Sequence, residues 1–188
     1  MNLTLILLAA GDSRRFHGNK LLYQIEGKPM YRWIMDEIEK LPQTLFYKKL
    51  IITQYEEIIK SLNGCPYKII KNQNSSLGIS HSIQLALKEL ESEETDFLFA
   101  VCDQPYLKSS TIHALVNGYH DSKKGLACLG SRGELGNPAI FSYRYREELK
   151  NLNGDKGGKR IIKKHMSDLF LLEVEDSNEL KDIDIRIN

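Results

Sequence analysis

Short apolar runs with no polar alternation recur along the chain. They lie at residues 3–8, 50–53, 67–70, 97–102 and 126–129. A strand that is buried on both faces has this pattern. Between these runs, apolar residues recur at helical spacing over 31–41, 56–62, 79–90 and 111–119. Because strands and helices alternate, the pattern predicts a three-layer α/β/α fold with a mostly parallel sheet.

The rhythm changes after Leu129. A turn-rich stretch at 130–138 is followed by a short predicted strand at 139–142. Helices are predicted near 145–152 and 156–165, and a last strand at 169–174. We expect this part to be an excursion that covers the ligand edge of the sheet. No internal repeat, low-complexity tract or long linker divides the chain, so residues 1–188 are predicted to form a single domain.

Charge and cysteine content narrow the classes of function. The chain has 26 basic and 25 acidic residues, a formal net charge of +1, which gives no global field for a nucleic-acid backbone. A local phosphate pocket remains compatible with this balance. Cys65, Cys102 and Cys128 form no C-x-x-C pair, so we expect buried thiols and no zinc site. The apolar run at 3–8 has no basic leader and is too short to span a bilayer, so we expect a cytoplasmic protein without a membrane partner.

The first candidate for chemistry is the loop after the first predicted strand. It reads Gly11-Asp12-Ser13-Arg14-Arg15-Phe16-His17-Gly18-Asn19-Lys20. Ligands of parallel sheets bind beyond the carboxyl ends of the strands, and glycine amides with nearby cations suit a polyphosphate there. It is not a P-loop, because Gly11 and Gly18 are seven residues apart and Leu21 follows Lys20. Taken alone, the loop is equally compatible with a mobile basic segment.

The second candidate is Asp103, which follows the apolar run at 97–102 directly. A carboxylate at the end of a buried strand is costly unless it binds a cation or caps a helix. Pro105 stops the strand, so we expect Asp103 to point into the crevice and to bind Mg²⁺. The alternative is that Asp103 caps the turn at Ser109 and Ser110, although it lies early for that role.

These residues together resemble a known family. Leu8-Ala9-Ala10-Gly11, with Ser13, Arg15 and Lys20 and then Gly27-Lys28-Pro29, resembles the signature of the nucleotidylyltransferases related to the molybdenum-cofactor guanylyl- and cytidylyltransferases. Further segments follow in the family's order: Leu77 to Ser82, Asp103-Gln104-Pro105, Gly136 to Phe141, Gly154 to Lys159 and Asp182-Ile183-Asp184. The pattern is most similar to the molybdenum cofactor cytidylyltransferase branch. The resemblance implies a Rossmann-like, glycosyltransferase-A-like nucleotidyltransferase fold.

The resemblance also implies a reaction and the residues that perform it. CMP would pass from CTP to molybdopterin with release of pyrophosphate, with Mg²⁺ as cofactor and transient contact with a molybdoenzyme or its chaperone. Arg15, Lys20 and Asp103 would be catalytic, and Asp103 and Asp184 would bind the metal. The nucleotide would contact Leu8, Ala9, Ala10, Gly11, Ser13, Arg15, Lys20, Gly78, Ser80, Ser82 and Asp103. The acceptor would contact Gln104, Asn137, Pro138 and Asp155. A phosphate monoester is largely anionic at neutral pH, so it needs no general base.

Several alternatives stay open at this point. Ser80 and Asp155 are each compatible with ordinary helix N-capping, and Asp184 with a terminal loop acid. The chain departs from the family at His17, where a Gly is usual, and at Lys159, where an Arg is usual. The acceptor could be another phosphorylated small molecule such as a sugar phosphate, or the chain could be a non-catalytic carrier of the molybdenum cofactor. Ala10, where the guanylyl branch has Gly, predicts a preference for CTP over GTP.

Overall fold

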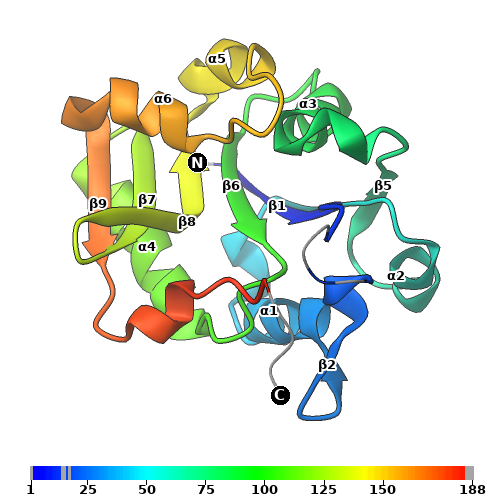
Figure 1. Ribbon diagram of the computed structural model, residues 1–188. Helices are drawn as coiled ribbons and strands as arrows, with labels where there is room; N and C mark the ends of the chain where they lie inside the picture. Colours follow the sequence, from blue (N-terminus) through cyan, green and yellow to red (C-terminus); the bar gives the residue numbers. More distant parts are fainter. Residues whose placement is uncertain (1, 14–15, 17, 185–188) are drawn as a thin grey trace.

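The computed structural model describes residues 2–13, 16 and 18–184 (Figure 1). Its centre is a seven-stranded sheet with the strand order β5-β4-β1-β6-β8-β7-β9. The strands are β1 (Leu3–Ala9), β4 (Lys48–Thr53), β5 (Lys68–Lys71), β6 (Asp96–Val101), β7 (Leu126–Ser131), β8 (Glu134–Phe141) and β9 (Leu169–Glu173). A two-stranded hairpin, β2 (Gln24–Ile25) with β3 (Lys28–Pro29), stands apart from the sheet. The predicted mostly parallel sheet is confirmed.

The sheet contains one antiparallel strand, β8, between β6 and β7. All other neighbours in the seven-stranded sheet pair in parallel. The hairpin from β7 to β8 turns at Arg132 and Gly133, which both have positive φ. The expectation of an excursion that covers the ligand edge was therefore wrong for residues 130–138. Their turn residues occupy only the tip of a hairpin whose strands extend the sheet.

Helices cover both faces of the sheet, as the buried runs predicted. They are α1 (Met30–Glu39), α2 (Glu56–Ser61), α3 (Ile79–Glu89), α4 (Ser109–Ser122), α5 (Arg146–Lys150) and α6 (Lys159–Lys164). Short 3₁₀ helices lie at Lys20–Leu22, Gln43–Leu45, Ser75–Leu77, Tyr143–Tyr145, Met166–Asp168 and Ser177–Leu180. Figure 1 shows α3, α5 and α6 on one side of the sheet and α1 on the other. The three-layer fold is confirmed.

Strand β1 explains why the sequence pattern lacks polar alternation. Leu5 and Leu7 pack with α1, α2 and α4 in one core, whereas Ile6 packs with α3, α5 and α6 in the other. Successive side chains of a strand point to opposite faces, so both must be apolar when both faces are covered. The two helical layers therefore hold the central strands in place from both faces. They also fix the position of the sheet edge at which these strands end.

The structure contains no disulfide among its described cysteines. Cys102 and Cys128 are buried, Cys65 is half-buried, and all three are free. Burial raises the pKa of both buried thiols, that of Cys128 to about 11. In the part of the chain that the structure describes, no helix combines the length and the apolar character needed to cross a membrane.

Candidate active site

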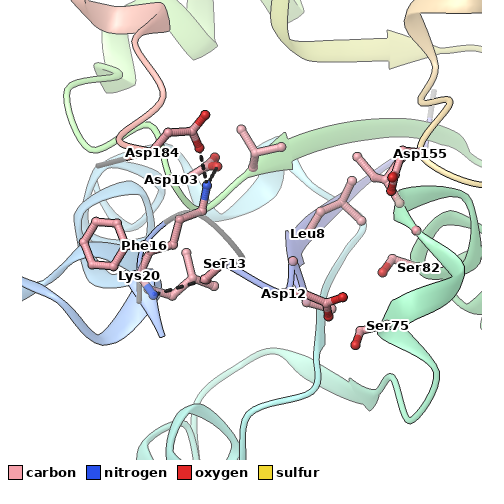
Figure 2. A pocket seen from close by; sticks show the side chains of 16 residues that line it. Leu8, Asp12, Ser13, Phe16, Lys20, Ser75, Ser82, Asp103, Asp155 and Asp184 are labelled. Atoms are coloured by element: carbon pink, nitrogen blue, oxygen red, sulfur yellow. Dashed lines mark hydrogen bonds and ion pairs between the residues drawn. The ribbon is translucent and has the colours of Figure 1, made fainter. Parts of the chain in front are cut away.

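A cavity of about 320 Å³ opens beyond the carboxyl ends of β1 and β6 (Figure 2). Strand β1 pairs with β4 on one side and with β6 on the other. The order in which successive strands join the sheet therefore reverses at β1. Such switch points are the usual ligand sites of open α/β sheets. The lining comprises Leu8, Ala10, Gly11, Asp12, Ser13, Phe16, Lys20, Leu21, Ser75, Gly78, Ile79, Ser82, Val101, Asp103, Asp155 and Asp184.

Three charged side chains meet at one end of this cavity. Lys20 Nζ lies 2.6 Å from Asp103 Oδ2 and 3.0 Å from Asp184 Oδ1. Figure 2 shows the ammonium joined to both carboxylates by dashed lines, with Ser75, Ser82 and Asp155 on the opposite side of the view. Burial alone would lower the pKa of Lys20, but the charge and hydrogen bonds of the two aspartates outweigh it and raise that pKa. Lys20 is therefore a fixed cation at neutral pH.

The C-terminal segment reaches this end of the cavity through long-range contacts. The Ile183 amide donates to the Asp103 carbonyl at 3.0 Å, and the Ile183 side chain is buried. Gln104 Nε2 donates to the Leu180 carbonyl and, at 2.8 Å, to Asp182 Oδ1. Gln104 is buried and lies outside the cavity lining, so it holds the segment that carries Asp184. Burial and the charge of Asp103 raise the pKa of Asp182.

The two carboxylates suit a divalent metal ion that is shared with a phosphorylated ligand. Asp103 Oδ1 is buried and has no hydrogen-bond partner among the described residues. Within residues 2–13, 16 and 18–184, no three His, Cys, Asp or Glu side chains gather to hold a metal alone. Mg²⁺ typically takes one or two carboxylates and completes its shell with water and substrate phosphates. Asp103 and Asp184 match this donor set.

The capping alternative for Asp103 is wrong. Helix α4 begins at Ser109, and its N-cap Lys108 makes no side-chain cap. The Ser109 amide instead donates to Glu37 Oε2 of α1, at 2.9 Å. Asp103 therefore has no part in starting α4 and faces the cavity.

The first loop forms a second wall of the cavity. Ser13 Oγ accepts from the Lys20 amide at 3.2 Å, and Ala10 and Gly11 line the cavity, whereas Ala9 is buried outside it. The predicted contact Arg15 and the departure His17 lie outside the described residues, as does Arg14.

Two residues at this wall had no signal in the sequence. Gln54 and Tyr55, directly after β4, donate to the Ala10 and Gly11 carbonyls. They belong to no motif, and their partners lie 44 residues earlier in the chain. Only the parallel pairing of β1 with β4 brings them together.

The start of α3 forms the opposite wall. Gly78 has φ of +84° and is the N-cap, and a Cβ there would lie 2.5 Å from the Gly154 carbonyl carbon. Only glycine fits both the backbone angle and this close approach. Ser80 lies within the helix, is buried and makes no side-chain cap, so the capping reading of Ser80 is wrong. Ser82 lines the cavity and accepts from Asn72 Nδ2 at 3.0 Å.

A second cavity, of about 400 Å³, adjoins the first. Leu8, Ile79 and Asp155 line both. Its other lining residues are Ile83, Phe99, Asn137, Ala139, Phe141, Lys156, Gly157, Gly158, Lys159, Arg160 and Lys163. Four of these are cations and two are aromatic. The four cations are exposed and the two phenylalanines are buried, so the cavity is basic at its rim and apolar at its floor.

Some of the predicted acceptor contacts line the second cavity, and others do not. Asn137 and Asp155 line it, whereas Pro138 is buried within β8, after a cis peptide bond, and lies outside the lining. Asp155 does not cap α6, which begins at Lys159 with Gly158 as its N-cap. The capping alternative for Asp155 is therefore wrong.

Comparison with known proteins agrees with this arrangement. A sequence model described as the MobA-like NTP transferase domain matches residues 5–169. The chain is 27% identical over 190 residues to the purine catabolism protein PucB of Bacillus subtilis, covering 95% of this chain and 90% of PucB. It is 29% identical over 156 residues to the bifunctional protein GlmU of Caldicellulosiruptor saccharolyticus, covering 81% of this chain. The chain spans only about a third, 32%, of that GlmU.

Solved structures share the fold. The Rv0371c homologue from Mycobacterium sp. strain JC1 superposes with a TM-score of 0.79 at 22% identity, covering 97% of this chain and 90% of that one. The molybdopterin-guanine dinucleotide biosynthesis protein A of Archaeoglobus fulgidus gives a TM-score of 0.71 at 14% identity, covering 97% and 92%. Because the sequence match runs across both walls of the first cavity, the chain belongs to the MobA-like NTP transferase family.

Proposed function

We propose that this chain, acting as a single nucleotidyltransferase domain, transfers CMP from CTP to the phosphate of molybdopterin and releases pyrophosphate. The observation that carries this proposal is the junction of two different cavities. One holds a cation between two carboxylates, and the other is basic at its rim with an aromatic floor. They meet at Leu8, Ile79 and Asp155, which gives room for a nucleotide and an acceptor side by side.

The first cavity suits the nucleoside triphosphate. Transfer needs the α-phosphorus to face the acceptor and the negative charge of the leaving pyrophosphate to be balanced. Lys20 supplies a fixed positive charge there. Arg15 is proposed to supply a second positive charge to the triphosphate. Asp103 and Asp184 would hold Mg²⁺, which when bound supplies charge neutralisation of the phosphates. The first-loop backbone and the start of α3 position the nucleotide around this centre.

The second cavity suits a phosphorylated acceptor with a planar ring. Lys156, Lys159, Arg160 and Lys163 line it, and Asp155 is the one acid among its described lining residues. A phosphate monoester held by these cations attacks as an anion, so no proton needs to be removed first. The replacement of the family's usual Arg by Lys159 is accompanied here by Arg160, which keeps a guanidinium at this rim.

Asn137 and Asp155 favour a second candidate acceptor within the same reaction class. Both are polar, both line the second cavity, and both can hydrogen-bond to hydroxyl groups. A sugar phosphate presents such hydroxyls together with a nucleophilic phosphate.

Pyrophosphate release is the decisive measurement. The purified chain with CTP and Mg²⁺ is given molybdopterin, a panel of sugar phosphates, or no acceptor. We expect release with molybdopterin only. Release with a sugar phosphate alone would move the assignment to the second candidate. Binding of molybdopterin without release from any acceptor would indicate a carrier protein.

A further inference from the structure

Two consecutive side chains hold the first loop from behind. Gln54 Nε2 donates to the Ala10 carbonyl at 2.9 Å, and the Tyr55 hydroxyl donates to the Gly11 carbonyl. Ala10 and Gly11 line the first cavity, whereas Gln54 and Tyr55 do not. Both carbonyls at the start of the loop are thus bonded to groups outside the cavity.

Because the peptide group is planar, the direction of each carbonyl also fixes the direction of the amide that follows it. In a trans peptide, the carbonyl of one residue and the N–H of the next point in opposite directions. When the Ala10 and Gly11 carbonyls face Gln54 and Tyr55, the amides of Gly11 and Asp12 face away from them, on the side of the cavity. Apart from Gly11 and its two chain neighbours, no heavy atom of the described residues lies within 4 Å of the place a Cβ would take at Gly11, so a ligand can approach this backbone. Successive amides that face one side form an anion-binding concavity.

Gln54 also connects this loop to the opposite wall. The same Nε2 lies 3.1 Å from Asp12 Oδ1, and Gln54 Oε1 accepts from Ser75 Oγ at 3.1 Å. Asp12 and Ser75 both line the cavity. The side chain of Gln54 therefore links the first loop to the opposite wall of the cavity. It also hydrogen-bonds to the carboxylate of Asp12, which lies beside the Gly11 and Asp12 amides.

We propose that Gln54 and Tyr55 are positioning residues that aim the Gly11 and Asp12 amides at the triphosphate of the nucleotide. This inference rests on the proposed function, because it assumes that the first cavity receives a triphosphate. Neither side chain touches the ligand, and both act through the backbone they hold. Burial raises the pKa of Tyr55 above its usual value, so its hydroxyl remains a donor at neutral pH.

The test uses anion binding without turnover. Tripolyphosphate is titrated calorimetrically, without metal, into the wild-type chain and the variants Tyr55→Phe and Gln54→Met. Each variant keeps the shape and loses the polar contacts. Losing one such hydrogen bond should weaken tripolyphosphate binding by about tenfold. Cytidine, followed by saturation-transfer NMR, should bind all three chains alike, because it has no phosphate for the two amides to contact.

Matched controls come from the same region of the fold. Tyr47 and Gln43 are exposed, lie at or before the other end of β4, and make no side-chain hydrogen bond recorded among the described residues. Tyr47→Phe and Gln43→Met should bind tripolyphosphate as the wild type does.

Three outcomes would overturn the inference. They are wild-type tripolyphosphate affinity in both test variants, an equal loss of cytidine binding, and an equal loss in the two controls. The second would mean that Gln54 and Tyr55 merely support the fold. A chain that shows the expected tripolyphosphate pattern but releases no pyrophosphate with any acceptor would contradict the proposed function and leave this inference standing.

Discussion

The Lys20 ammonium pairs with both Asp103 and Asp184, at 2.6 Å from Asp103 Oδ2 and 3.0 Å from Asp184 Oδ1. A divalent ion bound to the same two carboxylates would lie close to this ammonium, and the two positive charges would repel each other. Lys20 and a divalent ion therefore compete for the carboxylates until a triphosphate gives the ammonium another partner.

This competition makes Lys20→Met an informative variant. Without nucleotide, it should bind Mn²⁺ more tightly than the wild type, by about tenfold or more, because a charge pair of this kind contributes a few kcal/mol in a partly buried site. Free Mn²⁺ measured by electron paramagnetic resonance gives the affinity. Lys28→Met, which removes the more exposed pair of Lys28 with Asp36, is the control. Unchanged Mn²⁺ affinity in Lys20→Met would mean that the ammonium does not oppose metal binding.

Asp103→Asn should abolish transfer and leave the fold intact. The amide keeps the shape of the side chain but loses the charge that would fix Mg²⁺. Turnover should fall by several decades, or roughly 4 kcal/mol of transition-state stabilisation. Pyrophosphate release measures the loss, and Asp121→Asn on the exposed part of α4 is the control. Near-normal turnover would remove Asp103 from the mechanism.

Two neighbouring lysines of α6 test whether the acceptor binds in the second cavity. Lys163 lines the second cavity, whereas Lys164 pairs with Glu148 at 2.9 Å. Lys163→Met should raise the KM for the acceptor by about tenfold, the value of one charged hydrogen bond, and leave the KM for CTP unchanged. Lys164→Met should change neither. Initial rates at varied acceptor decide this, and an equal effect of both variants would place the acceptor elsewhere.

Ala10 should make the first cavity favour CTP over GTP. Its side chain is buried and lines the cavity, so we expect it to reduce the room for a purine. A ligand present at 100 times its Kd stabilises the native state by about 2.7 kcal/mol, enough for a visible shift in Tm. We expect CTP with Mg²⁺ to raise Tm more than GTP at equal concentration, and Ala10→Gly to narrow the difference. A larger shift with GTP would contradict the steric argument.

Asp168 should make part of the stability depend on acid pH. Burial alone would raise its pKa, but hydrogen bonds from Tyr145, the Gly125 amide and Arg144 outweigh it and lower the pKa below 3.8. A carboxyl with a lowered folded pKa stabilises above its unfolded pKa and loses that contribution as the pH falls. Asp168→Asn should therefore cost about 1 kcal/mol near pH 7. Urea unfolding at several pH values should show this difference shrinking below about pH 3.8, and a constant difference would assign the effect to packing.

The sequence predicted six of the seven strands of the main sheet to within two residues, because both faces of the sheet are covered. It missed β2 and β3 and placed the start of β8 five residues too late. It also placed Lys20 and Asp103 together, since strands that pair in parallel end at the same edge. The hairpin of β7 and β8 was not predicted. Residues 130–138 are rich in turn-forming residues and so are typical of a loop, although most of them pair as strands. Gln54 and Tyr55 were not predicted either. Their role depends on a pairing between distant segments, which single-sequence periodicity does not report.

The place of β8 in the sheet has a consequence for how such a protein can diversify. The first cavity is lined mostly by segments up to Asp103, whereas β8, α6 and the loop between α5 and α6 supply most of the second cavity. If the first cavity binds the nucleotide and the second binds the acceptor, as we propose, mutations after β7 can change the acceptor without changing the nucleotide site. Relatives that use different acceptors should therefore differ most between residues 137 and 163.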